Sequence, residues 1–355
     1  MNFPYNTDLW SYLRATDKTI VMYGMGNGAD KILNICDRYG IAVSDFFASD
    51  GFVRGHSFHG KTVLRYADVK EKYGADRMIV LLSFASSLPE VLELFYRIDA
   101  ECELYAPDVP VCGETLFDLA FVRAHAEELQ EVYSLLADEE SKRIFERVIQ
   151  YKLSGSISYL RDAESEKDEV YRSLLRAESI RSAADLGAYN GDTVRELMGY
   201  AHDLQTVCAL EPDRRNFRKL NDFAETLTAP TVHALQAAAW DRDTVLSFAD
   251  SGNRNAGAFA KGKQVEVAAR ALDSVLDGAP VDYIKYDVEG AEREALMGSA
   301  ETIVRHKPRL LVSVYHRSED LFALPLLVRQ LNPDYRLYLR RYPYVPAWDL
   351  NLICV

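Results

Sequence analysis

The highest density of reactive side chains lies at residues 285–289, directly after a short apolar run. Lys285, Asp287 and Glu289 occupy alternate positions, so an extended backbone would place all three on one face. A lysine and two carboxylates are costly to bury as core, and they suit a polar substrate. We therefore expect residues 285–289 to take part in a reaction on a polar substrate. The alternative is a Lys285–Asp287 ion pair that only shapes the loop.

His316 ends another apolar run, at 310–314, and is a further candidate for proton transfer. A carboxylate or an imidazole can remove the proton of a hydroxyl nucleophile. We prefer Asp287 or Glu289 as the anchor of the acceptor and take His316 as a candidate base, although a lone histidine is often structural. No metal is expected, because no cluster of histidines and cysteines demands one, although Asp287 with Glu289 could hold a hard cation.

A second polar site is predicted in the turn between a strand at 183–186 and a helix that starts near Thr193. Its two glycines allow a tight turn, and the helix N-terminus offers free N–H groups. A dinucleotide would place its pyrophosphate there, but Asp185 and Asp192 would repel phosphate. They suit a ligand with an ammonium group, such as S-adenosylmethionine. The expected contacts are Asp185, Gly187, Ala188, Tyr189, Asn190, Gly191 and Asp192.

The next strand, at 206–210, ends in Glu211, Pro212 and Asp213. An acidic side chain at the tip of this strand can accept both ribose hydroxyls of an adenosyl ligand. For each acid, the alternative is a helix cap or a solvated strand end. The acids at two neighbouring strand ends together favour the cofactor interpretation.

Four ordered motifs resemble those of FkbM-type methyltransferases. They are DxGAxxG at Asp185–Gly191, EPD with a following N at Glu211–Asp213 and Asn216, LDSxL at Leu272–Leu276, and IKxDVEGAE at Ile284–Glu292. The resemblance covers about Ser179–Val355. It implies a class I methyltransferase fold and methyl transfer from S-adenosylmethionine, usually to an oxygen of a sugar, glycan or natural product. In such folds the adenine commonly lies after the third strand, here at Ala239 and Trp240.

The elements that position these residues alternate between strand and helix, which is typical of an α/β fold. Strands are predicted at 183–186, 206–210, 231–236, 283–286 and 310–314. Segments 335–340 and 350–355 could pair antiparallel and complete a seven-stranded sheet. Arg340 and Arg341 could meet an anionic substrate, but we favour a solvated edge strand. The polar segment 252–257 is either a lid or a plain loop.

Residues 1–113 are predicted to form a smaller Rossmann-like α/β domain. Strands are expected at 19–23, 41–48, 78–83 and 103–105, with helices at 29–39, 66–73 and 88–98. The turn Gly24-x-Gly26-x-Gly28 is weak support for a nucleotide site. The domain could be an accessory or substrate-recruiting module, a nucleotide or nucleotide-sugar binder, or a nicotinamide site. Residues 114–178 are expected to be a helical connector with a break at Gly155, and residues 179–355 the methyltransferase domain.

The composition of this 355-residue chain limits the classes of molecule that it can be expected to bind. Its net charge of -13 disfavours nucleic acid and anionic membranes, so we expect a small-molecule or glycan acceptor. Five cysteines without a CxxC pair and no signal-peptide pattern predict a cytoplasmic protein. The chain could form a homo-oligomer. The competing functions are a non-catalytic nucleotide or nucleotide-sugar binding protein and a nicotinamide-dependent oxidoreductase that acts through the first domain.

Overall fold

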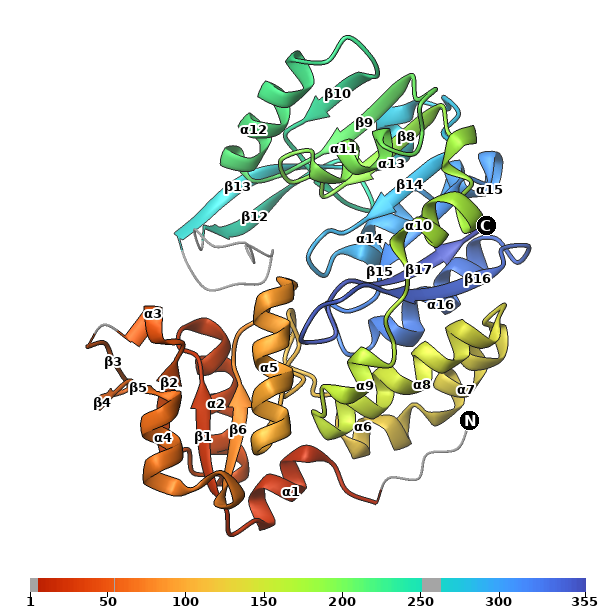
Figure 1. Ribbon diagram of the computed structural model, residues 1–355. Coiled ribbons are helices and arrows are strands. Elements are labelled where there is room, and N and C mark those ends of the chain that lie inside the picture. The colour runs from red at the N-terminus through yellow and green to blue at the C-terminus, as the bar shows by residue number, and fades with distance from the viewer. Residues whose placement is uncertain (1–5, 54, 251–262) are drawn as a thin grey trace.

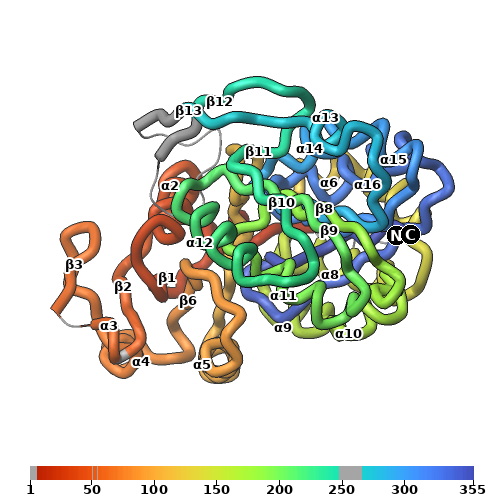
Figure 2. The backbone as a smooth tube through the Cα atoms, turned by 90° about the horizontal axis from the view of Figure 1, so that it is seen from above, coloured from red at the N-terminus to blue at the C-terminus, as the bar shows by residue number. Residues whose placement is uncertain are grey.

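The computed structural model describes residues 6–53, 55–250 and 263–355 (Figure 1). The polar segment at 252–257 lies outside these residues. A short helix, α1 (Leu9–Ala15), precedes two sheets, and a run of helices joins the sheets along the chain. Figure 2 shows the two sheet-containing parts from a second direction. Within the described ranges, every helix is too short or too polar to cross a bilayer.

The first sheet has five parallel strands in the order β5-β2-β1-β6-β7. This confirms the predicted Rossmann-like architecture. The strands are β1 (Thr19–Tyr23), β2 (Asp45–Ala48), β5 (Leu64–Arg65), β6 (Met78–Leu82) and β7 (Glu103–Tyr105). The helices are α2 (Asn27–Tyr39), α3 (Asp50–Val53), α4 (Tyr66–Tyr73), α5 (Pro89–Glu101) and the 3-10 turn η1 (Ala75–Arg77), and a hairpin joins β3 (Ser57–Phe58) to β4 (Lys61–Thr62).

The second strand of this sheet is shorter than predicted, because it starts at Asp45 and not at residue 41. Gly40 adopts a left-handed conformation that ends α2, and the N–H of Ile41 donates to the carbonyl of Cys36 at 2.8 Å. Ile41 is buried, so it is the apolar residue that closes the helix end. Its apolar character marks a helix cap here, not a strand.

Helices fill the stretch between the sheets. They are α6 (Leu119–Ala124), α7 (Ala126–Leu135), α8 (Glu139–Ser154), α9 (Ser158–Arg161), α10 (Lys167–Glu169), the π-helix η2 (Val170–Leu174) and the 3-10 turn η3 (Ala177–Ser179). Asp118 and Asp138 cap α6 and α8 through their side chains. Helix α8 ends at Gly155, whose φ of 70° is left-handed, so the predicted break is confirmed.

The second sheet has seven strands, as predicted, and their order is β10-β9-β8-β14-β15-β17-β16. The pairings from β10 to β15 are parallel, whereas β17 pairs antiparallel with both β15 and β16. The strands are β8 (Ser182–Leu186), β9 (Thr206–Leu210), β10 (Thr231–Leu235), β14 (Tyr283–Tyr286), β15 (Arg309–Ser313), β16 (Leu337–Arg341) and β17 (Leu350–Cys354).

Helices flank this sheet, and a smaller sheet extends from it (Figure 1). The helices are α11 (Asp192–Met198), α12 (Arg214–Glu225), α13 (Leu272–Leu276), α14 (Glu292–Met297), α15 (Ala300–His306) and α16 (Asp320–Leu331). The smaller sheet has the order β11-β13-β12, from β11 (Ala238–Ala239), β12 (Thr244–Asp250) and β13 (Lys263–Arg270).

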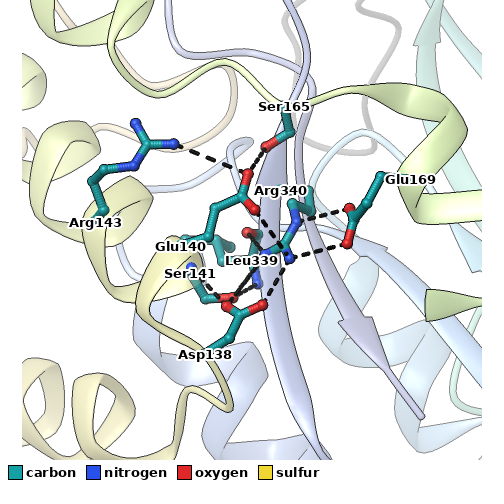
Figure 3. Close-up of polar contacts among 8 residues, drawn as sticks. All are labelled: Asp138, Glu140, Ser141, Arg143, Ser165, Glu169, Leu339 and Arg340. Atoms are coloured by element: carbon teal, nitrogen blue, oxygen red, sulfur yellow. Dashed lines mark hydrogen bonds and ion pairs between the residues drawn. The ribbon is translucent and has the colours of Figure 1, made fainter. Parts of the chain in front are cut away.

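The prediction that Arg340 and Arg341 lie on a solvated edge strand was wrong. β16 is last in the strand order, but both arginines are buried, with exposures of 1% and 0%. Figure 3 shows Arg340 among acids of the connecting helices: its Nη2 lies 2.7 Å from Asp138 Oδ2 and 3.4 Å from Glu140 Oε2, and its Nε lies 3.1 Å from Glu169 Oε2. Arg341 donates to the carbonyls of Leu160 and Tyr344. The Arg340 side chain therefore links β16 to the connecting helices. The Arg341 side chain links β16 to α9 and to the turn that follows β16.

Candidate functional site

The chain order of the seven-stranded sheet reverses between β8 and β14. Open α/β sheets bind ligands beyond the carboxyl ends of their strands at such a point. Asp185 of β8 and Lys285 of β14 are partners in the strand register. The sequence-predicted cofactor site and reaction site therefore begin on adjacent strands.

Lys285 connects the two sites. Its Nζ lies 3.6 Å from Asp185 Oδ1 and 3.5 Å from Asp287 Oδ2, and its side chain is buried. Burial lowers the pKa of Lys285, but the two carboxylates outweigh it and hold the pKa above its usual value. Burial raises the pKa of Asp287, but Lys285 and His316 outweigh it and keep that pKa low. The ion-pair alternative therefore describes Lys285 better than direct contact with a substrate does.

The turn after β8 folds back onto the end of β9. The N–H groups of Gly187 and Ala188 both donate to the carbonyl of Leu210 at 3.0 Å, and Tyr189 N donates to Glu211 Oε2 at 2.8 Å. Tyr189 and Gly191 have φ values of 46° and 82°, in the left-handed region. This conformation brings the acidic turn and the EPD segment into direct contact.

Two acceptors in this turn are buried without a hydrogen-bond partner among the described residues. They are Oδ1 of Asp185 and Oδ1 of Asn190. The other oxygen of Asp185 accepts the hydroxyl of Thr193, and burial raises the pKa of Asp185. Unsatisfied buried acceptors are costly unless a donor reaches them. They fit a ligand that carries N–H or O–H donors, such as the ammonium group of an amino acid.

Glu211 is buried at the tip of β9 and supports the turn with both oxygens. Its Oε1 accepts the N–H of Asp213 at 2.8 Å, in addition to the bond from Tyr189. Burial raises the pKa of Glu211 to about 7. Each carboxylate oxygen has a second lone pair, so the group can still accept a hydroxyl.

The other acids near this site have structural roles. Asp213 caps α12 by accepting the N–H groups of Arg215 and Asn216 at 2.9 Å, and Pro212 lies between it and Glu211. Asp192 is exposed and accepts the N–H of Thr193. These contacts match the cap alternative. They leave Glu211 and Asp185 as the buried acids of the cofactor site.

Ala239 and Trp240 belong to a different part of the fold. Ala239 lies in β11, and the N–H of Trp240 donates to the carbonyl of Arg270 at the end of β13. Both residues follow β10, whose end accepts the N–H of Glu211 through the carbonyl of Leu235. They are thus linked to Glu211 through the backbone, while their role beside an adenine stays a prediction.

Replacing Gly187 by alanine should damage this site strongly. A Cβ at Gly187 would lie 1.9 Å from the carbonyl oxygen of Asp287. This oxygen belongs to the backbone, so it cannot rotate away as the end of a side chain could. We expect a loss of more than about 3 kcal/mol of unfolding free energy, measured by urea denaturation. Gly40→Ala is the matched control, because its φ is also positive but its Cβ meets nothing within 4 Å. It should cost about 1–2 kcal/mol, and equal losses in the two variants would contradict the predicted clash.

Asp287, Glu289 and His316 meet, but not by strand alternation. β14 ends at Tyr286, and Glu289 has a φ of 54°, so the extended geometry expected from the sequence is wrong. The carboxylates converge on His316, whose Nε2 lies 3.7 Å from Asp287 Oδ1 and 3.6 Å from Glu289 Oε2. The loop conformation therefore assembles the predicted groups around one imidazole.

Glu292 is a site residue that the sequence interpretation missed, although it ends the fourth motif. Its Oε1 lies 2.9 Å from His316 Nδ1, and each of these two residues is 1% exposed. The same oxygen accepts the N–H of Val288 at 2.9 Å. One ligand atom each from Asp287, Glu292 and His316 lie within 4.8 Å of one another. An acid in the first turn of a helix is usually a solvated cap, so its pairing with His316 was not visible in the sequence.

The protonation states favour a carboxylate over the imidazole as proton acceptor. Burial lowers the pKa of His316, but Glu292, Asp287 and Glu289 outweigh it and raise the pKa to about 10. The imidazole is then already protonated at neutral pH. Burial raises the pKa of Glu289 to about 7, which suits a group that gains and loses a proton near neutrality.

The first part of the chain reaches this loop through Cys112. Its thiol donates to the carbonyl of Glu289 at 3.0 Å, and its N–H donates to the carbonyl of His316 at 2.9 Å. A Cβ on Gly290 would lie 2.9 Å from Cys112. Lys31 of α2 in turn donates to the carbonyl of Val111 at 2.8 Å. The N-terminal part thus supports the loop, a contact that the sequence did not indicate.

Comparison with known proteins agrees with this arrangement. A family model for the methyltransferase FkbM domain matches residues 185–346, from the acidic turn to beyond His316. Residues 185–346 are an FkbM methyltransferase domain. The FkbM domain includes the turn, the EPD segment and the carboxylate loop described above. A comparison of the sequence with curated proteins gave no match.

Solved structures extend the similarity of fold beyond the FkbM domain. A crystal structure of methyltransferase FkbM from Methylobacillus flagellatus KT has a TM-score of 0.72 and 22% identity, covering 96% of this chain and 91% of that chain. An rRNA methylase from Streptococcus thermophilus has a TM-score of 0.36 and 13% identity, covering 54% of this chain and 96% of that chain. The first comparison shows that the N-terminal sheet and the connecting helices share the fold of that protein.

Proposed function

We propose that the FkbM domain transfers a methyl group from S-adenosylmethionine to a hydroxyl of a sugar, glycan or other natural product. The observation that carries the proposal is the placement of Asp185 and Asp287 at the ends of adjacent strands, with Lys285 between them. A donor site and an acceptor site then lie side by side. This is the requirement for direct transfer between two bound molecules.

In this proposal the cofactor occupies the turn after β8. The ammonium group of its amino-acid part donates to the Oδ1 atoms of Asp185 and Asn190, which accept no hydrogen bond from the described residues, and the ribose hydroxyls donate to Glu211. The backbone of the turn encloses the ligand, and the adenine lies toward the residues that follow β10. The proposed contact set is Asp185, Gly187, Ala188, Tyr189, Asn190, Gly191, Asp192, Glu211, Pro212, Asp213, Ala239 and Trp240, with Asp287 at the border between the cofactor and the acceptor.

S-adenosylmethionine supplies an activated methyl group, so the protein must mainly position and deprotonate the acceptor. Asp287 is held by Lys285 and by the hydroxyl of Tyr315 at 3.2 Å, and it would orient the acceptor hydroxyl. Glu289 would accept the proton as the new O–C bond forms and the C–S bond breaks. His316 would remain the cationic partner of the carboxylates.

The glycine turn of the N-terminal sheet adds little support to the nicotinamide alternative. A Cβ on Gly24 would lie 2.5 Å from Ser83 Oγ, and one on Gly28 would lie 2.1 Å from the Ser83 carbonyl oxygen. Packing against the end of β6 therefore requires both glycines, with or without a nucleotide. We propose an accessory or substrate-recruiting role for this part of the chain.

The test is incubation of the full chain with methyl-labelled S-adenosylmethionine and a panel of free sugars, glycans and hydroxylated natural products. A labelled ether, stable to base and identified by mass spectrometry, is the expected product, together with S-adenosylhomocysteine. Transfer only to amine or carbon acceptors would overturn the proposed oxygen specificity. Binding of S-adenosylmethionine without transfer to any acceptor would favour the non-catalytic alternative.

Cofactor affinity should fall as the pH is lowered through about 7. Hydroxyl donors favour the ionised form of Glu211, whose pKa in the free protein is about 7. Binding must therefore displace a proton at lower pH, and the affinity should drop by up to about tenfold per pH unit. Calorimetric titration with S-adenosylhomocysteine from pH 5.5 to 8.5 measures this slope. Glu211→Gln should bind more weakly and flatten the step near pH 7, whereas an unchanged step would assign it to another group.

A further inference from the structure

We propose that Asp287, Glu292 and His316 form a binding site for one divalent cation of the Mn²⁺ or Zn²⁺ type. The three residues come from separate segments, namely the loop after β14, the start of α14 and the loop after β15. One potential ligand atom from each lies within 4.8 Å of the others. The fold thus brings two carboxylates and an imidazole, which are common ligands of such ions, to one point.

The distances within this trio are close to those between ligands of one metal ion. His316 Nδ1 lies 2.9 Å from Glu292 Oε1, as a protonated imidazole does beside a carboxylate. His316 Nε2 lies 3.7 Å from Asp287 Oδ1. Ligands bound to one ion at about 2.0–2.2 Å are separated by about 3 Å when they are at right angles. An ion binds one ring nitrogen, so coordination requires the carboxylate beside the other nitrogen to move toward the ion.

An unsatisfied buried atom is a second and independent indication of a ligand. Glu292 Oε2 is buried, in a residue that is only 1% exposed, and it has no hydrogen-bond partner in the described part of the chain. Buried polar atoms normally have a partner, and an exception calls for an ion or a water. A cation at the trio would give this oxygen a partner.

The charge balance around the trio also favours a cation. Asp287, Glu289, Glu292 and Asp320 surround His316, and Asp320 accepts the N–H of Arg317 at 2.8 Å. Lys285 is shared between Asp287 and Asp185. These four carboxylates outnumber Lys285, Lys31 and Arg317, the lysine and arginine side chains near them in the described part of the chain. A divalent ion would offset this excess and would displace the proton that His316 carries in the metal-free protein.

The ligand types indicate which ions to expect. An imidazole with two carboxylates suits Mn²⁺ and Zn²⁺, whereas Ca²⁺ prefers six to eight oxygen ligands. Binding of the ion does not depend on methyl transfer. If the proposed function holds, the ion would lie beside the acceptor and polarise its hydroxyl oxygen.

The test is calorimetric titration of the EDTA-treated full chain with MnCl₂ and ZnCl₂, with CaCl₂ as comparison. We expect one ion per chain, bound in the micromolar range or tighter, and much weaker Ca²⁺ binding. Glu292→Gln and His316→Gln should each weaken binding by at least about tenfold. Glu294→Gln, on the same helix but outside the trio, is the matched control and should bind like the wild type. Circular dichroism would verify that each variant is folded.

Equal affinity in all variants, or no wild-type binding below about millimolar, would overturn the ion site. A second measurement needs no variant: pulsed electron paramagnetic resonance of the Mn²⁺-loaded wild type should show coupling to an imidazole nitrogen. Absence of that coupling would also overturn the site. Failure of the ion site is distinguishable from failure of the proposed function, because titration and resonance report ion binding alone, whereas the labelled-methyl assay reports transfer alone.

Discussion

Replacing Asp287 by asparagine should lower kcat for methyl transfer by about a hundredfold or more, while the Kd of S-adenosylmethionine changes by less than about threefold. Asn keeps the shape of the side chain but removes the charge that Lys285 and His316 balance at 3.5 and 3.7 Å. The buried acids that would bind the cofactor, Asp185 and Glu211, are unchanged. The acceptor would lose the group that orients its hydroxyl.

Single-turnover assays with labelled cofactor, combined with calorimetry, separate the two effects. Asp334→Asn is the control, because Asp334 is an exposed acid of the same domain that pairs with Lys307 on the surface. It should leave both kcat and Kd at wild-type values. A normal kcat in Asp287→Asn would show that this residue takes no part in the reaction. A large rise in Kd alone would show that it binds the cofactor.

Replacing Arg340 by methionine should destabilise the protein by about 3–5 kcal/mol. The arginine is 1% exposed, and it is the cation that Asp138, Glu140 and Glu169 share (Figure 3). Methionine fills similar space but leaves three carboxylates at the connector without their common partner. The cost arises from uncompensated charge, since similar volume is retained.

Urea unfolding monitored by circular dichroism measures this change. Arg336→Met is the matched control, because Arg336 is exposed near the start of the same strand. Its expected effect is within about 0.5 kcal/mol. An Arg340→Met variant within about 1 kcal/mol of the wild type would show that the carboxylates find other partners or are protonated.

The strands of the second sheet were predictable because each is a short apolar run bounded by polar turns. β9 and β14 have the predicted bounds, and β8 differs by one residue at its start. The seven-stranded sheet, with its antiparallel β16–β17 pair, was also expected. Local pattern and alternation are sufficient for these features, because they depend on burial of neighbouring residues along one segment.

The parts that could not be predicted depend on partners far away in the sequence. The sequence position of Arg340 suggests a solvated residue, but the connecting helices bring Asp138 and Glu169 beside it. Judged by its sequence position alone, Glu292 is an acid at the start of a helix, and only the fold brings His316, from the loop after β15, beside it. Ile41 was predicted to begin a strand, but in the structure it caps the end of a helix. In each case a long-range contact or a backbone cap determines the role of a residue whose type alone allows several.

Titration calorimetry of the wild-type chain with S-adenosylmethionine, and separately with NAD, tests whether the adenosyl cofactor binds this protein. We expect one S-adenosylmethionine per chain with a Kd in the micromolar range and no binding of NAD in that range. Binding of NAD without binding of S-adenosylmethionine would contradict this expectation and would move the function to the N-terminal sheet.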